Sequence, residues 1–198
     1  MENNEKMMSS QESLKIISEM ISRTKMNIKQ GRFHLLLWGW LIVLCSLAEY
    51  LLFHLTSFEN PWLVWLITIP GVIVSLIYGF IKGSKQTVYT YADRIYMWLW
   101  IGFLFTAIIL FVFIGVENRM HTVGPFILML AALPTFMSGV IIKFRPLMFG
   151  GISIWIFSLI GFFAGPLIGP LAVPAAMITG YLIPAYMLKN NGVKNDTV

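Results

Sequence analysis

The basic residues of this chain are sorted to one side of a series of apolar stretches. If six such stretches are threaded through a bilayer with both chain ends in the cytoplasm, thirteen of the fourteen Lys and Arg residues fall in cytoplasmic segments, and only Arg119 falls outside. Cytoplasmic loops of membrane proteins carry this excess of positive charge. The sequence therefore predicts a polytopic membrane protein and its orientation.

The composition excludes an ordinary soluble domain. Of the 198 residues, 58% are hydrophobic and 12% are charged, whereas soluble domains are about 45–50% apolar and about 25% charged. The net charge of +5 does not indicate nucleic-acid binding, because the basic residues stand in short clusters beside apolar spans. The single cysteine, Cys45, lies inside an apolar stretch, so no intrachain disulfide is expected.

Six spans are predicted from the lengths of the apolar stretches. They cover residues 33–55, 61–81, 95–116, 123–142, 147–164 and 171–188. The last two come from a charge-free tract that the segment 165–170 divides into two short halves, each about 27 Å long as a helix. Two short spans are expected here, and a re-entrant hairpin is the alternative.

A polar N-terminal segment, residues 1–32, precedes the spans. Ser9 and Glu12 fit a capping box, and apolar positions recur at alternating spacings of three and four: Leu14, Ile17, Ile21, Thr24 and Ile28. This pattern predicts a cytoplasmic amphipathic helix with one apolar stripe. The stripe is expected to meet the headgroup boundary or the ends of other helices, or else to dock on a protein partner or a second copy. A polar cytoplasmic tail, 189–198, ends the chain.

Glu49 is the one acidic residue well inside a span. A charge at the centre of a membrane helix costs about 2.5–3.5 kcal/mol, and less near the interface, so this carboxyl group requires a polar partner or a proton. Two hypotheses follow. Glu49 is a proton or cation site in a small transport path, or it is a near-interface residue bonded to Tyr50, His54 or a loop.

Constellations typical of enzymes are not found. The three histidines lack the spacing of a metal site, and no nucleophile motif or phosphate-binding glycine loop is present. The glycines at 161, 165 and 169 indicate close helix packing or entry into a loop. We therefore predict a protein that is not an enzyme and that has no metal site and no cofactor.

Five basic residues flank the spans on the predicted cytoplasmic side: Lys82, Lys85, Arg94, Lys143 and Arg145. Topology alone accounts for them, and each would gain up to about 1 kcal/mol from anionic headgroups. The even-numbered spans share a second pattern, a proline followed four or five residues later by a hydroxyl side chain. These pairs are Pro70 with Ser75, Pro134 with Ser138, and Pro174 with Thr179. Three helical hairpins would produce this pattern.

Four segments resemble a family of uncharacterised small multi-pass inner-membrane proteins of the Bacteroidota. They are FHLLLWGW at 33–40, PWLVWL at 61–66, KFRPLMFGGI at 143–152 and YLIPAYML at 181–188, with QESL at 11–14 in the N-terminal helix. The likeness covers nearly the whole chain. It implies a bacterial inner-membrane location and no assigned reaction.

The sequence thus predicts an all-α membrane protein of six transmembrane helices, preceded by a cytoplasmic amphipathic helix, with both termini cytoplasmic. The leading hypothesis is an integral inner-membrane protein without a catalytic site that binds a partner or senses the state of the membrane as a regulatory subunit. Its partners would be the lipid bilayer, a protein or a second copy bound through the N-terminal helix, and no nucleic acid. The alternative is a small homo-oligomeric transporter that uses Glu49.

Overall fold

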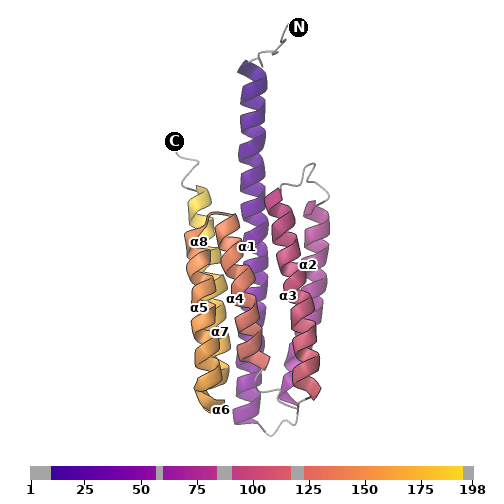
Figure 1. The fold of residues 1–198 in the computed structure, drawn as a ribbon, viewed down its shortest axis with the longest axis vertical. Helices are drawn as coiled ribbons and strands as arrows, with labels where there is room; N and C mark the ends of the chain where they lie inside the picture. Colours follow the sequence, from indigo (N-terminus) through magenta and orange to yellow (C-terminus); the bar gives the residue numbers. More distant parts are fainter. Residues whose placement is uncertain (1–9, 57–59, 84–90, 117–122, 194–198) are drawn as a thin grey trace.

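The chain is an all-helical bundle in the part that the computed structural model describes, residues 10–56, 60–83, 91–116 and 123–193 (Figure 1). No strand occurs in these ranges. Six helical stretches are long and apolar enough to cross a membrane: Gly31–Leu55, Pro61–Ile81, Arg94–Ile114, Val123–Ile141, Arg145–Phe163 and Gly169–Leu188. They agree with the predicted spans to within a few residues, so the predicted class of all-helical membrane protein is confirmed.

The first helix, α1, covers Ser10–Leu55 and has 46 residues. At about 1.5 Å per residue it is about 69 Å long, roughly twice the thickness of a hydrocarbon core. Its C-terminal half lies in the bundle, and its N-terminal half projects beyond the other helices (Figure 1). The predicted N-terminal helix and the first span are therefore one continuous helix. The N-terminal half follows the axis of the span and does not bend into the plane of a membrane.

The second and third spans lie at the periphery of the bundle. The second begins as a 3-10 helix, η1 (Pro61–Ile67), and continues as α2 (Thr68–Gly83), and the third is α3 (Tyr91–Val116). Helix α2 packs on α1, and α3 packs on α4 (Val123–Ile141). Only 6% and 11% of the residues in these two spans are buried. Most of their apolar side chains thus face outward, as expected beside lipid.

The fourth and fifth spans form the closest helix pair. Helix α4 is followed by a tight turn and by α5 (Arg145–Phe163). Glycine permits the approach: a Cβ atom on Gly139 would lie 2.6 Å from the amide nitrogen of Met148, and one on Gly151 would lie 2.7 Å from the Cα of Phe136. Lys143, in the turn, has a φ of 54°, a left-handed conformation that side chains other than glycine seldom adopt.

The last span is assembled from several short helical segments. After the short connecting helix α6 (Gly165–Ile168), they are a 3-10 turn η3 (Gly169–Leu171), α7 (Ala172–Met177), a π-helical turn η4 (Ile178–Leu182) and α8 (Ile183–Val193). With 61% of its residues buried, this span is the most enclosed of the six. Helices α1, α4 and α5 pack against it.

The charge-free tract forms two helical spans. Helix α5 and the α7 to α8 segment both run along the length of the bundle (Figure 1), and the two candidate spans have 19 and 20 residues. Gly165, with a φ of 76°, lies between them. A Cβ atom on Gly169 would lie 2.7 Å from the carbonyl oxygen of Gly161, whereas one on Gly165 has nothing within 4 Å. Gly161 and Gly169 therefore pack closely, and Gly165 lies at the turn. The geometry favours two short spans over a re-entrant hairpin.

The hydrophobic core lies where α1, α4, α5 and the last span meet. Its buried side chains include one from α1 and several from the other three: Val43, Leu128, Ala132, Ile154, Ala176 and Met177. Helices α2 and α3 add few residues to this core. The bundle therefore consists of a compact core of α1, α4, α5 and the last span, with α2 and α3 packed on its outside.

Candidate functional site

Glu49 is tied to the beginning of the second span. Its Oε2 atom accepts a hydrogen bond of 2.8 Å from Nε1 of Trp65, in η1. One turn earlier on α1, the Sγ of Cys45 donates to the carbonyl oxygen of Val64 at 3.6 Å. These two contacts join α1 to η1. A tryptophan of the next span, rather than the expected Tyr50, His54 or loop, supplies the polar partner of the carboxylate.

His54 has a different role from Glu49, although only five residues separate them. Its Nδ1 lies 2.9 Å from the carbonyl oxygen of Tyr50, and its ring stacks at a tilt on that of Tyr50, with centroids 4.2 Å apart. This agrees with its position about 140° further round the helix. In the described part of the chain, no group of three or more His, Cys, Asp or Glu side chains could hold a metal ion.

A set of buried hydroxyl groups crosses the bundle, and we name it the hydroxyl seam: Tyr96, Thr135, Ser138 and Tyr181. The hydroxyls of Thr135 and Tyr181 are hydrogen-bonded at 3.2 Å, and the Tyr96 hydroxyl interacts with Ser138. Thr135, Ser138 and Tyr181 are each at most 5% exposed. The seam joins α3, α4 and the π-helical turn η4.

Two seam residues also hold the backbone around the proline within α4. Thr135 donates to the carbonyl oxygen of Ala131 at 2.7 Å, and Ser138 donates to that of Pro134 at 2.5 Å. A proline inside a helix removes one backbone donor, here the partner of the Leu130 carbonyl oxygen, and disturbs the preceding turn. The two hydroxyls bind neighbouring carbonyls of the same stretch and so add hydrogen bonds beside the break. The spacing of proline and hydroxyl was visible in the sequence. The hydrogen bonds of these hydroxyls to hydroxyls of other helices could not be seen in the sequence.

The π-helical turn η4 contacts three helices. Tyr181 reaches α4 through the seam, and Thr179 is hydrogen-bonded to Ser153 of α5 at 3.0 Å. A Cβ atom on Gly39 of α1 would lie 2.6 Å from the Leu182 side chain. Turns of π-helix are often found at functional sites. Here the turn fixes the position of the last span against its neighbours.

The predicted stripe of Leu14, Ile17, Ile21 and Ile28 lies on the projecting half of α1. The structure gives this half a helical backbone, but the side chains of these four residues lie outside what it describes. Where the projecting half meets the bundle, the Nε of Arg32 donates to the carbonyl oxygen of Ala185 at 3.2 Å. This contact joins α1 to α8.

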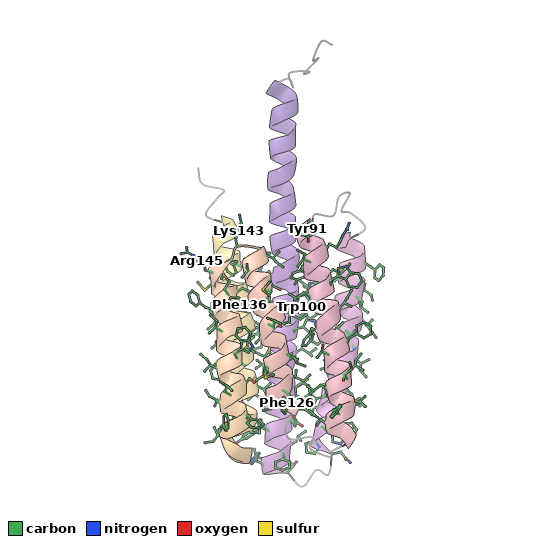
Figure 2. The ribbon with its side chains drawn as sticks, in the orientation of Figure 1. Tyr91, Trp100, Phe126, Phe136, Lys143 and Arg145 are labelled. Carbon is green, nitrogen blue, oxygen red and sulfur yellow. The ribbon has the colours of Figure 1, made fainter. Side chains whose placement is uncertain are left out.

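The basic flanking residues gather at one end of the bundle. Three of them are exposed: Arg94 in the first turn of α3, Lys143 in the turn after α4, and Arg145 at the first position of α5. Figure 2 shows Lys143 and Arg145 at the end from which α1 projects. We call this the basic end. Lys82 lies in α2, but its side chain, like the whole of Lys85, falls outside the described residues.

Comparison with protein-family models, with curated proteins and with solved structures finds no match to this chain. The class of the protein therefore rests on its fold. Six helices that are long and apolar enough to cross a membrane fit a multi-pass integral membrane protein. The resemblance to inner-membrane proteins of the Bacteroidota stays a prediction.

Proposed function

We propose that this chain is a non-enzymatic protein of a bacterial inner membrane, and that it binds a protein partner through the projecting half of α1. The continuity of α1 over Ser10–Leu55 carries the proposal. Because α1 continues the membrane span without a break, its projecting half extends out of the membrane, and the apolar stripe on this half lies in water. The stripe then requires a protein surface to cover it, because exposed apolar area is unfavourable in water.

The polar groups that the structure brings together support a role without catalysis. The seam hydroxyls bond to backbone carbonyls and to one another, and Glu49 bonds to an indole. A catalytic site needs a nucleophile or an acid–base pair within reach of a substrate. The observed bonds instead satisfy buried polar groups, which a helical bundle in lipid requires.

Co-purification from native membranes tests the proposal. The double substitution Leu14→Asp with Ile21→Asp places two charges in the stripe, and Ser22→Asp with Met26→Asp places two charges on the opposite side of the same helix. We expect the first variant to lose a bound protein by about tenfold or more and the second to retain it. Identical sets of co-purified proteins from both variants and the wild type would contradict partner binding.

Transport is the second candidate function, and Glu49 is the observation that favours it. A carboxylate within a span is typical of proton and cation pathways, and the outward faces of α2 and α3 offer surfaces for a homo-oligomer. Because Trp65 already supplies a hydrogen bond, the carboxylate has a structural role without a transported ion. We therefore rank transport second. Proton or cation flux in proteoliposomes that is lost in Glu49→Gln would reverse this order.

A further inference from the structure

The period of the α-helix shows which residues of α1 inside the bundle lie on the same face as each stripe position in the projecting half. Eighteen residues make five turns of an α-helix at about 3.6 residues per turn, so positions eighteen apart lie on one face. Each stripe position therefore has a counterpart inside the bundle. Position 17 corresponds to Leu35, position 21 to Gly39 and position 28 to Ser46.

These counterparts lie on the side of α1 that faces the bundle. Leu35 packs against both core clusters, a Cβ atom on Gly39 would lie 2.6 Å from the Leu182 side chain, and Ser46 is 5% exposed. On the other side of the helix, Leu44 and Leu51 are 60% and 50% exposed. The stripe positions therefore stand directly above the basic end of the bundle.

This placement argues against a second copy as the occupant of the stripe. Two parallel α1 helices paired along these positions would both continue into the same membrane. The second helix would then need the space that the last span fills, because that span contacts α1 at Gly39 and at Arg32. A flat bilayer surface does not fit the stripe either, since the projecting half extends along the axis of the span (Figure 1). The occupant must end at the basic end of the bundle.

The charge at this end selects the chemistry of the occupant. Lys143 and Arg145 are exposed there (Figure 2), and so is Arg94, three residues after Tyr91, which Figure 2 shows at the same end. The segments assigned to this side of the membrane by sequence carry thirteen cationic and six acidic residues in total. The apolar stripe on α1 lies next to the cationic basic end. Together they are complementary to a helix that has one apolar face and acidic residues beside it.

We infer that the stripe and the basic end together bind an acidic amphipathic helix of a separate protein at the membrane surface. Its apolar face covers positions 14, 17, 21 and 28, and its carboxylates meet Arg94, Lys143 and Arg145. This inference rests on the proposed function, partner binding through α1. It adds the side of α1 that binds, the charge of the partner, and a separate protein in place of a second copy.

Photo-crosslinking in cells that express the full chain tests the inference. A benzophenone amino acid is introduced at positions 17 and 21, in the stripe, and at positions 22 and 26, on the opposite side. We expect protein adducts at 17 and 21 to exceed those at 22 and 26 by about tenfold. The crosslinked peptide, identified by mass spectrometry, should be amphipathic and contain more Asp and Glu than Lys and Arg.

A pair of neutralised variants tests the charge complementarity. Lys143→Asn with Arg145→Gln removes two charges from the basic end, and asparagine tolerates the left-handed backbone at 143. Lys15→Gln with Arg23→Gln removes two charges from the opposite side of α1. We expect the first pair to lower the adduct at position 21 by about fivefold or more, and the second to leave it unchanged.

The possible outcomes distinguish failure of the acidic-partner inference from failure of partner binding itself. A stripe adduct to a basic peptide, or one insensitive to Lys143→Asn with Arg145→Gln, would overturn the acidic partner and leave partner binding intact. An adduct to a second copy or to the chain's own tail would overturn the placement above the bundle. The absence of a protein adduct at every stripe position, in protein shown to be inserted in the membrane, would overturn both.

Discussion

Gly150 and Gly180 lie back to back, so that a Cβ atom on Gly150 would stand 2.7 Å from the carbonyl oxygen of Gly180. On the other glycine, a Cβ atom would stand 2.5 Å from the Cδ1 atom of Ile154. In lipid, helices associate mainly through close packing, and small residues permit it. The distance between α5 and the last span is therefore set by two residues without side chains.

Gly150→Ala is expected to destabilise the bundle, because the added methyl group meets backbone atoms that cannot move independently. Overpacking of this kind costs about 1–3 kcal/mol. Gly102→Ala is the matched control, since a Cβ atom on Gly102, in α3, has nothing within 4 Å. Gly102→Ala should raise the free energy of unfolding by up to about 1 kcal/mol, because alanine has a higher helix propensity than glycine. Unfolding in mixed detergent measures both, and equal effects would contradict the packing described for α5.

Trp65→Phe is expected to destabilise the contact between the first two spans, because it leaves the Glu49 carboxylate without its indole donor. The free energy of unfolding should fall by about 1 kcal/mol. This is at the lower end of the range for unpaired charged groups, because the pair is half-buried. Glu49→Gln keeps an acceptor oxygen and should cost less. In the Trp65→Phe background, Glu49→Leu should recover stability. A double-mutant cycle measures this coupling, and additive effects would show that the pair contributes nothing.

Thr135→Val is expected to cost more than Tyr181→Phe, although both remove the same hydrogen bond. Valine leaves the buried Tyr181 hydroxyl without Thr135, whereas in Tyr181→Phe the threonine keeps its bond to the Ala131 carbonyl oxygen. Unpaired buried polar groups cost about 1–3 kcal/mol, while one lost bond in a membrane protein costs about 0.6 kcal/mol. Thr135→Ser retains the hydroxyl and serves as the control. Equal losses in unfolding experiments would argue against the seam.

The spans could be predicted from the sequence because transfer of side chains into lipid depends on local composition. Contacts between spans could not. The sequence predicts that Glu49 needs a polar partner, but its partner Trp65 lies 16 residues away, in the 3-10 helix that begins the second span. The segment Ile178–Leu182, inside the predicted span 171–188, is a π-helical turn. Its hydrogen bonds to α4 and α5 are contacts between spans, which apolar periodicity does not encode.

The orientation inferred from the basic residues predicts the reactivity of single cysteines. With Cys45→Ser as the background, Asn60→Cys should react with a membrane-impermeant maleimide added to intact spheroplasts, and Tyr91→Cys should react only after lysis. Both residues are exposed, so differences in burial do not explain a difference in labelling. The physical reason is the cost of moving cationic loops across the membrane. Labelling of both positions in intact spheroplasts would overturn this orientation.

Because α1 is one unbroken helix, positions 12 and 44 should be separated by the full helical rise. Nitroxide labels at Glu12→Cys and Leu44→Cys, in the Cys45→Ser background, are 32 residues apart and should give a distance of about 48 Å by pulsed electron resonance. A helix that bent at Gly31 to lie along a membrane would bring the labels to about 35 Å by the same rise. Gly31→Ala should narrow the distance distribution, since glycine loosens a helix interior and a Cβ atom at this position has nothing within 4 Å. Dilution with unlabelled protein separates distances within one chain from those between chains. A principal distance near the shorter value would mean that the stripe returns to the lipid surface, and the partner proposed above would lose its binding face.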